Sequence, residues 1–373
     1  MVIERNSRES FALDLLRFPL AALVVLLHTS ALGDDKGFTY YLANYINAPI
    51  VQVAVPAFFF MSGYLFFCGK EEFSWTVYKK KISKKVRSLL VPYIIWNYIA
   101  LFLSYAYSYS KTGSIGEVMP WDLKDIIWSH GDGIMATSVF GYQYPVIVSP
   151  AAGVLWFMRD LMVMMLCSIV GFYIVKRLKW WIFPLLIFMN VFGIGVPIAG
   201  FSLAAITFFY MGAFFSIHQI HIFDWLSKYN TCFWLLLWPI MVVVQFVAAS
   251  NGMDLKCISS LVLLSGIAFV FVIAYNLANK KNKVVTLITK WGETSFFIYT
   301  FGNTLILWFV NKDVGYFLES IPYCGTFLNY EFLFMAKVIE CIVVYYIMKK
   351  VTPSLLSVLI GGRINKRKEQ KWK

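Results

Sequence analysis

Apolar runs of about 20 residues recur along the whole chain, and this feature most restricts its fold. About 20 consecutive apolar residues are what a helix needs to cross the hydrocarbon core of a bilayer. The composition agrees, because only 14% of the residues are charged, against about 25% in soluble domains. We therefore predict an all-α polytopic membrane protein, a bundle of about ten transmembrane helices. The predicted helices lie near 11–32, 49–68, 88–109, 152–175, 180–198, 200–217, 231–249, 257–278, 293–311 and 327–349.

The distribution of positive charge predicts the orientation of this bundle. The chain carries 33 lysines and arginines and a formal net charge of +13. Most of them fall in segments that lie on one side of the membrane if both termini are cytoplasmic, as the positive-inside rule requires. This orientation, N-in and C-in, explains the excess charge without a nucleic-acid partner. The predicted partner is the lipid bilayer. The predicted location is the cell (inner) membrane, which the chain would cross several times.

Two regions stand apart in this layout. Residues 1–350 are expected to form one integral-membrane domain, and residues 351–373 a basic cytoplasmic tail. Segment 110–151 is the longest stretch outside the predicted helices and is placed on the outer side. Long ordered loops are often functional, so the sequence leaves open whether this segment is functional or a passive surface loop.

Three polar residues interrupt the first apolar run, namely Asp14, Arg17 and His28. At 100° per residue, Arg17 and His28 lie about 20° apart around a helix and about 16 Å apart along it. Ionisable groups in a membrane helix usually face a polar interior. Arg17 is expected near the cytoplasm, and His28 near the outer face as a general base. The alternative is structural: Asp14 and Arg17 pair to pack helices, and His28 bonds a neighbour.

A basic cluster precedes the third predicted helix. Arg87, Lys84 and Lys85 belong to it, and their charge suits the phosphates of a nucleotide-bearing donor. Ordinary positive-inside anchoring of the helix is the alternative interpretation.

The fourth predicted helix carries an adjacent charged pair close to the outer boundary. Arg159 and Asp160 follow Trp156 there, and neighbouring residues on a helix point about 100° apart. We therefore expect no direct face-to-face pair; one residue would orient the substrate or His28, and the other would cap a loop. His218 and His221 have a ligand-like spacing but no third ligand, so no metal site is predicted.

Taken together, several short motifs resemble the membrane acyltransferase-3 family, in its polysaccharide O-acetyltransferase type. Each motif is weak alone in an apolar chain, but their order from residue 8 to about 305 is specific. They are Asp14-Leu15-Leu16-Arg17 followed by His28, Phe58-Phe59-Phe60-Met61-Ser62-Gly63-Tyr64, Arg87-Ser88-Leu89-Leu90-Val91-Pro92, Leu155-Trp156-Phe157, and Ser295-Phe296-Phe297-Ile298-Tyr299.

The resemblance implies transfer of an acyl group, usually acetyl, from cytoplasmic acetyl-CoA to a hydroxyl of a surface polysaccharide or lipid-linked sugar. It also implies that Arg17 and His28 are essential and that the basic stretch before the third helix engages CoA. The chain departs from the family at two places. Family members often carry a histidine where this chain has Phe301-Gly302-Asn303, and another where it has Gly153-Val154, so the roles of those histidines do not transfer.

The prediction is therefore a bacterial cell-envelope O-acyltransferase. Its predicted catalytic residues are His28, Arg17 and Asp14, with His28 as general base or, less favoured, as acyl carrier. Arg87, Lys84 and Lys85 would bind acetyl-CoA, and Trp156, Arg159 and Asp160 the glycan acceptor. A transporter or flippase of lipid-linked glycan, a glycan polymerase and a non-catalytic relative are the rival interpretations. The acceptor sugar and the oligomeric state, a homodimer included, stay open.

Overall fold

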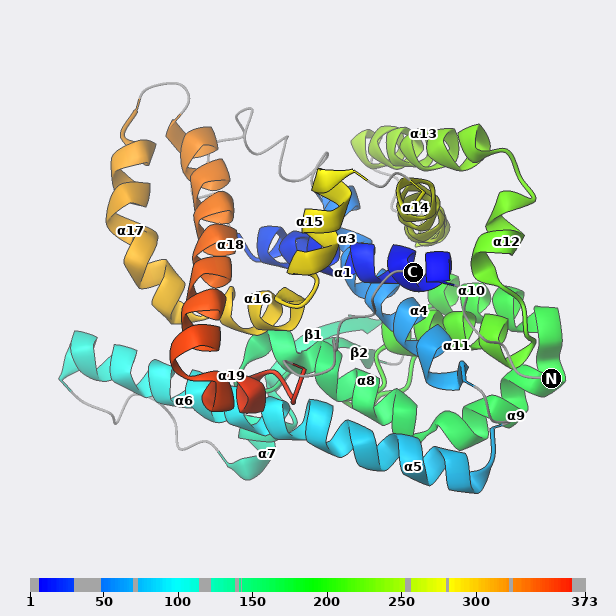
Figure 1. Ribbon diagram of the computed structural model, residues 1–373, viewed down its shortest axis with the longest axis horizontal. Helices are drawn as coiled ribbons and strands as arrows, with labels where there is room; N and C mark the ends of the chain where they lie inside the picture. The colour runs from blue at the N-terminus through cyan, green and yellow to red at the C-terminus, as the bar shows by residue number, and fades with distance from the viewer. Residues whose placement is uncertain are drawn as a thin grey trace.

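A computed structural model describes residues 7–29, 48–69, 73–113, 122–137, 141, 143–251, 256–279, 282–321 and 325–363 (Figure 1). Helices make up most of it, as predicted for an all-α membrane protein. The first half contains α1 (Ser7–Leu27), α3 (Ala48–Gln52), α4 (Ala54–Phe67), α5 (Trp75–Lys85), the π-helix η2 (Val86–Leu90), α6 (Val91–Thr112), α7 (Leu123–Ile127), β1 (His130–Thr137), β2 (Gln143–Ser149), η3 (Gly153–Leu155), α8 (Trp156–Leu166) and α9 (Ser168–Leu178).

The described part of the second half contains helices joined by turns and no strand. It contains η4 (Lys179–Trp181), α10 (Ile182–Phe192), α11 (Leu203–Ile217), α12 (Ile222–Ser227), α13 (Thr231–Ser250), α14 (Lys256–Leu277), α15 (Lys283–Trp291), α16 (Ser295–Phe301), α17 (Leu305–Glu319), α18 (Gly325–Val351) and α19 (Pro353–Leu359).

Five of the described helices are long and apolar enough to cross a bilayer, and one bent pair passes the same test. The five are Arg8–Leu27, Ala48–Phe67, Trp75–Thr112, Thr231–Ala248 and Cys257–Leu277. These helices support a multi-pass membrane protein. The number of ten crossings and the N-in, C-in orientation stay predictions.

Helix α1 lies at the centre of the bundle (Figure 1). It packs against α4, α14, α15, α16 and α18, so both halves of the chain converge on it. Its start is fixed by Arg8, which donates two hydrogen bonds to the carbonyl of Tyr275, and by Glu9, which is fully buried against His221 at 3.0 Å. Helix α1, which carries the predicted catalytic residues, is therefore packed against other helices on most of its sides.

Helices α4 and α11 cross so closely that their backbones touch. A Cβ atom added to Gly63 would lie 1.9 Å from the carbonyl oxygen of Phe209, and one added to Gly212 would lie 2.0 Å from that of Phe60. Small residues permit such an approach between membrane helices. The glycine of the Ser62-Gly63-Tyr64 motif thus has a structural function, because any side chain there would separate the two helices.

The third predicted helix begins earlier than the sequence suggested. Residues Trp75–Thr112 form one continuous helical path, whereas we predicted a start near residue 88. Pro92 has no N–H to donate, and it is the second residue after η2, a turn of π-helix that includes Arg87. The basic cluster is therefore helical and is not a loop.

Two other predicted helices are interrupted. The apolar stretch 152–175 is bent by 69° at Cys167, between α8 and α9. The predicted helix 293–311 is also two helices, because α16 ends at Phe301 and α17 starts at Leu305. The glycines and Pro197 between residues 193 and 200 predict a turn between two helices, and the structure confirms it, because Gly193 ends α10 in the left-handed conformation with φ of 62°.

The described part of segment 110–151 contains a β-hairpin that the sequence reading did not predict. Strands β1 and β2 pair antiparallel, with Ala136 opposite Tyr144. The ring of Tyr144 packs on the turn after α10, where a Cβ added to Gly195 would lie 2.4 Å from it. The hairpin therefore packs against the helix bundle through Tyr144.

The last described residues pack against the same bundle. Helix α19 packs on α6 (Figure 1), with Leu356 and Ile360 fully buried. The indole nitrogen of Trp96 donates a buried hydrogen bond of 3.0 Å to the carbonyl of Leu359. The predicted boundary at residue 351 falls inside this packed region, while residues 364–373 of the tail lie outside the described residues.

Candidate active site on the central helix

The residues predicted to be catalytic lie on one side of α1. With 100° per residue, Asp14, Arg17, Ala21, Val25 and His28 fall within about 80° of one another around the helix. The backbone keeps this periodicity to the end, because the N–H of His28 donates to the carbonyls of Val24 and Val25. We call these five residues the α1 stripe.

The N-terminal end of the α1 stripe is an exposed ion pair. Nη1 of Arg17 lies 3.2 Å from Oδ1 of Asp14, and the two side chains are 44% and 31% exposed. Arg17 forms no other ion pair or hydrogen bond with the described residues. Its guanidinium therefore keeps donor capacity for an anionic ligand.

The C-terminal end of the stripe is His28, directly after α1. Its side chain is exposed, and its ring nitrogens have no hydrogen-bond partner among the described residues. The ammonium of Lys337, on α18, is near enough to act on it electrostatically. Lys337 and Glu340 are three residues apart in α18, a spacing that favours an ion pair. No ion pair joins them among the described contacts, although they are near enough to interact electrostatically, and Glu340 accepts a hydrogen bond of 2.9 Å from Asn311.

Between its two polar ends the stripe is closed by apolar packing. Ala21 and Val25 are fully buried and share a cluster with side chains of α16 and α18 and the start of α17, namely Ile298, Leu307, Val338 and Cys341. Gly302, after α16, fits tightly there, because a Cβ added to it would lie 2.9 Å from Val25. Among the described residues, therefore, apolar side chains fill the middle of the stripe between Arg17 and His28.

The predicted donor-binding cations lie on the helical path of α5 and η2. Lys84 and Arg87 are exposed, whereas Lys85 is partly buried. No hydrogen bond or ion pair joins Lys84 or Arg87 to Arg17 in the described part of the chain. Lys81, which precedes them, donates to the carbonyl of Cys68 at 3.2 Å and so ties α5 to the end of α4.

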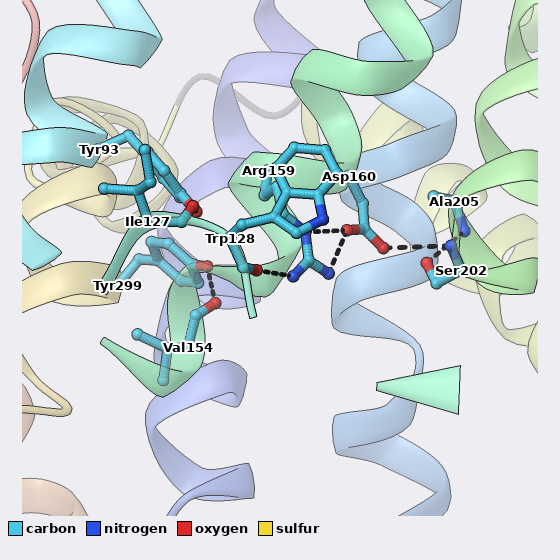
Figure 2. A network of polar contacts seen from close by, with 9 residues as sticks. All are labelled: Tyr93, Ile127, Trp128, Val154, Arg159, Asp160, Ser202, Ala205 and Tyr299. Carbon is cyan, nitrogen blue, oxygen red and sulfur yellow. Dashed lines mark hydrogen bonds and ion pairs between the residues drawn. The ribbon is translucent and has the colours of Figure 1, made fainter. Parts of the chain in front are cut away.

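The charged pair of α8 behaves differently from our expectation. Figure 2 shows Arg159 and Asp160 joined directly, with Nε and Nη2 of Arg159 at 3.0 and 2.7 Å from Oδ1 of Asp160. The expectation that adjacent residues would not pair was wrong, because the long arginine side chain folds back to its neighbour. Both side chains are buried, at 3% and 0% exposure.

Further hydrogen bonds satisfy this buried pair (Figure 2). Nη1 of Arg159 donates to the carbonyl of Trp128, and Oδ2 of Asp160 accepts from the N–H of Ser202, at the start of α11. The pair thereby ties α8 to the outer segment and to α11. Trp156, the third predicted acceptor residue, is partly buried, with its ring 6.3 Å from that of Phe59.

Two tyrosines extend the same region. Tyr299, from the motif in α16, donates to the carbonyl of Val154, and Tyr93 donates to the carbonyl of Ile127 (Figure 2). Asn97 accepts a hydrogen bond of 2.9 Å from the N–H of Ala152. The sequence reading assigned these residues no such role, although Tyr299 lay in a quoted motif.

The two histidines with ligand-like spacing are both engaged elsewhere. His221 bonds Glu9, and His218 lies 3.2 Å from the carbonyl of Val175. Among the described residues, no group of three histidines, cysteines or acidic residues is placed to hold a metal ion.

Comparison with known proteins identifies the family. A family model described as an acyltransferase domain, the third of the acyltransferase families, matches residues 10–346. Neither the curated proteins nor the solved structures contain a match to the chain. The matched range includes the whole α1 stripe, the basic helix and the buried pair of α8. Since the match spans nearly the whole chain, this protein belongs to the membrane acyltransferase-3 family and is a multi-pass membrane acyltransferase.

Proposed function

We propose that this protein is an O-acyltransferase of the cell (inner) membrane, which moves an acetyl group from cytoplasmic acetyl-CoA to a hydroxyl of a surface or lipid-linked glycan. The observation that carries the proposal is the α1 stripe. It presents a guanidinium at one end and an imidazole at the other, about 16 Å apart along one helix face. Acetyl-CoA has phosphates at one end of a long arm and a thioester at the other. The phosphates would lie toward the guanidinium of Arg17 and the thioester toward the imidazole of His28.

The donor binds at the cytoplasmic end. Arg87, Lys84 and Lys85 attract the phosphates of CoA, and the exposed charges of Lys84 and Arg87 support this role. Arg17 receives the donor further inside the bundle. Asp14 holds the Arg17 side chain through their ion pair and leaves its remaining N–H groups for the ligand.

The chemical step takes place at His28. A ring nitrogen of His28 accepts the proton of the glycan hydroxyl while its oxygen attacks the thioester carbonyl. The tetrahedral intermediate collapses, the carbon–sulfur bond breaks, and the thiolate of CoA takes the proton from the imidazolium. The products are the acetyl ester and free CoA. Lys337 is near enough to favour the negative oxygen of the intermediate.

The apolar closure of the stripe implies a second conformation during turnover. The thioester meets His28 only if α16 and α18 give way around Ala21 and Val25. Gly302 and Asn303 interrupt the helix at this contact, between α16 and α17. The segment is thereby able to move without unfolding a continuous helix.

The acceptor approaches from the outer side. Trp156 is the partly exposed member of the predicted acceptor residues and is suited to stack on a sugar ring. Arg159 and Asp160 are buried and paired, so they act by holding the α7 and α11 segments around the acceptor. They do not touch the glycan in this arrangement.

The test uses the purified full-length protein in lipid nanodiscs with radiolabelled acetyl-CoA and lipid-linked glycan extracted from the native membrane. The expected result is label in the glycan as an alkali-labile ester, together with release of CoA thiol. CoA release without a labelled glycan, or a glycan whose chain length alone changes, would refute the proposal. The second outcome would favour a polymerase.

A further inference from the structure

The last described residues fold back onto the bundle through two glycines. Gly361 and Gly362 follow α19 with φ of 69° and 73°, a backbone region that other residues rarely adopt. Gly361 is also placed where a Cβ would lie 2.3 Å from the carbonyl oxygen of Ser88. This turn directs Arg363 toward the interior of the protein instead of toward the solvent.

Arg363 is held in place by two contacts. Its Nη2 donates a hydrogen bond of 3.2 Å to the carbonyl oxygen of Ser88, and its guanidinium lies 4.0 Å above the ring of Phe296. Its Nη1 is shielded from solvent and has no hydrogen-bond partner among the described residues. A shielded N–H without an acceptor costs free energy, so a hydrogen-bond acceptor at Nη1 would be favourable.

A second guanidinium, that of Arg17, is near enough to act on Arg363 electrostatically. Burial and the nearby charge of Arg17 lower the pKa of Arg363 to about 10, so the Arg363 guanidinium remains protonated at neutral pH. Arg17 is partly neutralised by Asp14, whereas Arg363 has no acidic partner among the described residues. Two adjacent cations with one carboxylate leave a local excess of positive charge, which an anion would compensate.

The site also adjoins the predicted donor region. Ser88, which accepts the hydrogen bond from Arg363, follows Arg87 within the π-helix η2. Single π-helical turns inside α-helices often occur at functional sites. The site therefore brings together α1, η2, α16 and the C-terminal segment.

We propose that Arg363 and Arg17 form a phosphate-binding site for the acyl donor, with the unpaired Nη1 of Arg363 donating to a phosphate oxygen of CoA. The inference rests on the proposed function for the identity of the donor. It gives residues 353–363 a function, because α19 and the Gly361–Gly362 turn position Arg363. Planar guanidinium groups bind phosphates in a bidentate manner. A lipid phosphate offers the same chemistry, and the experiment separates the two sources.

The experiment compares Arg363→Gln with the wild type, both full-length and in nanodiscs. Affinity is measured calorimetrically for CoA and for dephospho-CoA, and kcat/KM is measured for acetyl-CoA and for acetyl-pantetheine, which has no phosphate. Loss of a charged hydrogen bond weakens binding about 10- to 100-fold. We expect CoA affinity to fall by that factor, and the kcat/KM ratio of acetyl-CoA to acetyl-pantetheine to fall with it.

The matched control is Arg177→Gln, which removes an exposed arginine of α9 and is expected to change neither quantity. Arg363→Lys keeps the positive charge but lacks the planar guanidinium. Its CoA affinity is expected to lie between that of the wild type and that of Arg363→Gln. An Arg363→Gln protein with unchanged CoA affinity, or with equal losses on acetyl-CoA and acetyl-pantetheine, would overturn the inference.

Two further outcomes separate the explanations. If Arg363→Gln binds CoA normally but loses the thermal stabilisation that phosphatidylglycerol vesicles give the wild type, the ligand is a lipid phosphate and the donor site is refuted. If CoA binding depends on Arg363 but no glycan is acylated, the phosphate site stands and the proposed function fails. Acylation that is insensitive to Arg363→Gln leaves the function standing and refutes the site.

Discussion

Two arginine–aspartate pairs of this protein have the same chemistry and opposite environments. The Asp14–Arg17 pair on α1 is 31% and 44% exposed, and its single short contact is 3.2 Å. The Arg159–Asp160 pair on α8 is almost fully buried, and its closest contact is 2.7 Å. The buried pair also bonds the backbone of Trp128 and Ser202.

The difference shows which pair is available for a ligand. All three guanidinium nitrogens of Arg159 are engaged by protein oxygens, so this pair serves to connect segments of the fold. Arg17 engages one carboxylate and keeps the rest of its donors accessible. A charged motif in a membrane helix is therefore a candidate ligand site only when its hydrogen bonds are incomplete. The following experiments test this distinction, from the largest expected effect to the smallest.

Asp160→Asn is expected to have the largest effect, on folding. Removing one charge of a buried pair leaves the other uncompensated, which costs about 3–5 kcal/mol. We expect a large loss of thermal stability in detergent and of monodisperse protein, measured by fluorescence-detected size exclusion. A stable Asp160→Asn protein that fails only in acceptor binding would show that the buried pair contacts substrate.

His28→Ala is expected to remove catalysis and to spare the fold. Loss of a general base typically slows a reaction about 10²- to 10⁴-fold, and the exposed imidazole bonds no described residue. The measurement is kcat for acetyl transfer, with thermal stability as the control. A variant that inserts normally and still acylates at the wild-type rate would exclude His28 as the base.

Arg17→Gln is expected to weaken donor binding by about 10- to 100-fold, because a charged hydrogen bond to phosphate is lost. An exposed ion pair contributes no more than about 1 kcal/mol, so thermal stability stays close to that of the wild type. The effect is measured as KM for acetyl-CoA. Combining it with Arg363→Gln should give less than additive losses, because both groups act on one ligand.

Lys84→Gln is expected to have the smallest effect. An exposed lysine acts on the donor over a distance and through water, which contributes about 1 kcal/mol or less. The rise in KM for acetyl-CoA should therefore be about fivefold or smaller and should vanish at high ionic strength. A loss that persists in high salt would place Lys84 in direct contact with the donor.

The sequence predicted the helical class and most helix positions correctly, because apolar length is a local property. It did not predict the bend at Cys167, since neither proline nor glycine marks that position and the apolar run continues through it. It also placed the start of the third helix too late. The lysine-rich stretch looked like a loop, but its helix continues through Pro92 by means of η2.

For the site, helical spacing was enough to place Arg17 and His28 on one side of α1. Helical spacing does not show which residues become neighbours through tertiary packing. The residues that the sequence analysis missed are such tertiary neighbours. Arg363 lies 275 positions from the serine that it bonds, and only the two preceding glycines hinted at a turn. Lys337 interacts electrostatically with Glu340 in its own helix, but it also acts on His28, from a distant part of the chain, which the spacing did not predict.

The apolar closure around Ala21 and Val25 has a consequence for the cell. A membrane that stores a proton gradient is short-circuited by any continuous file of water. Narrow apolar constrictions exclude water and so resist ion flow. In the proposed mechanism, Arg17 and His28 lie on opposite sides of such a constriction, so the closed state would not conduct protons between them.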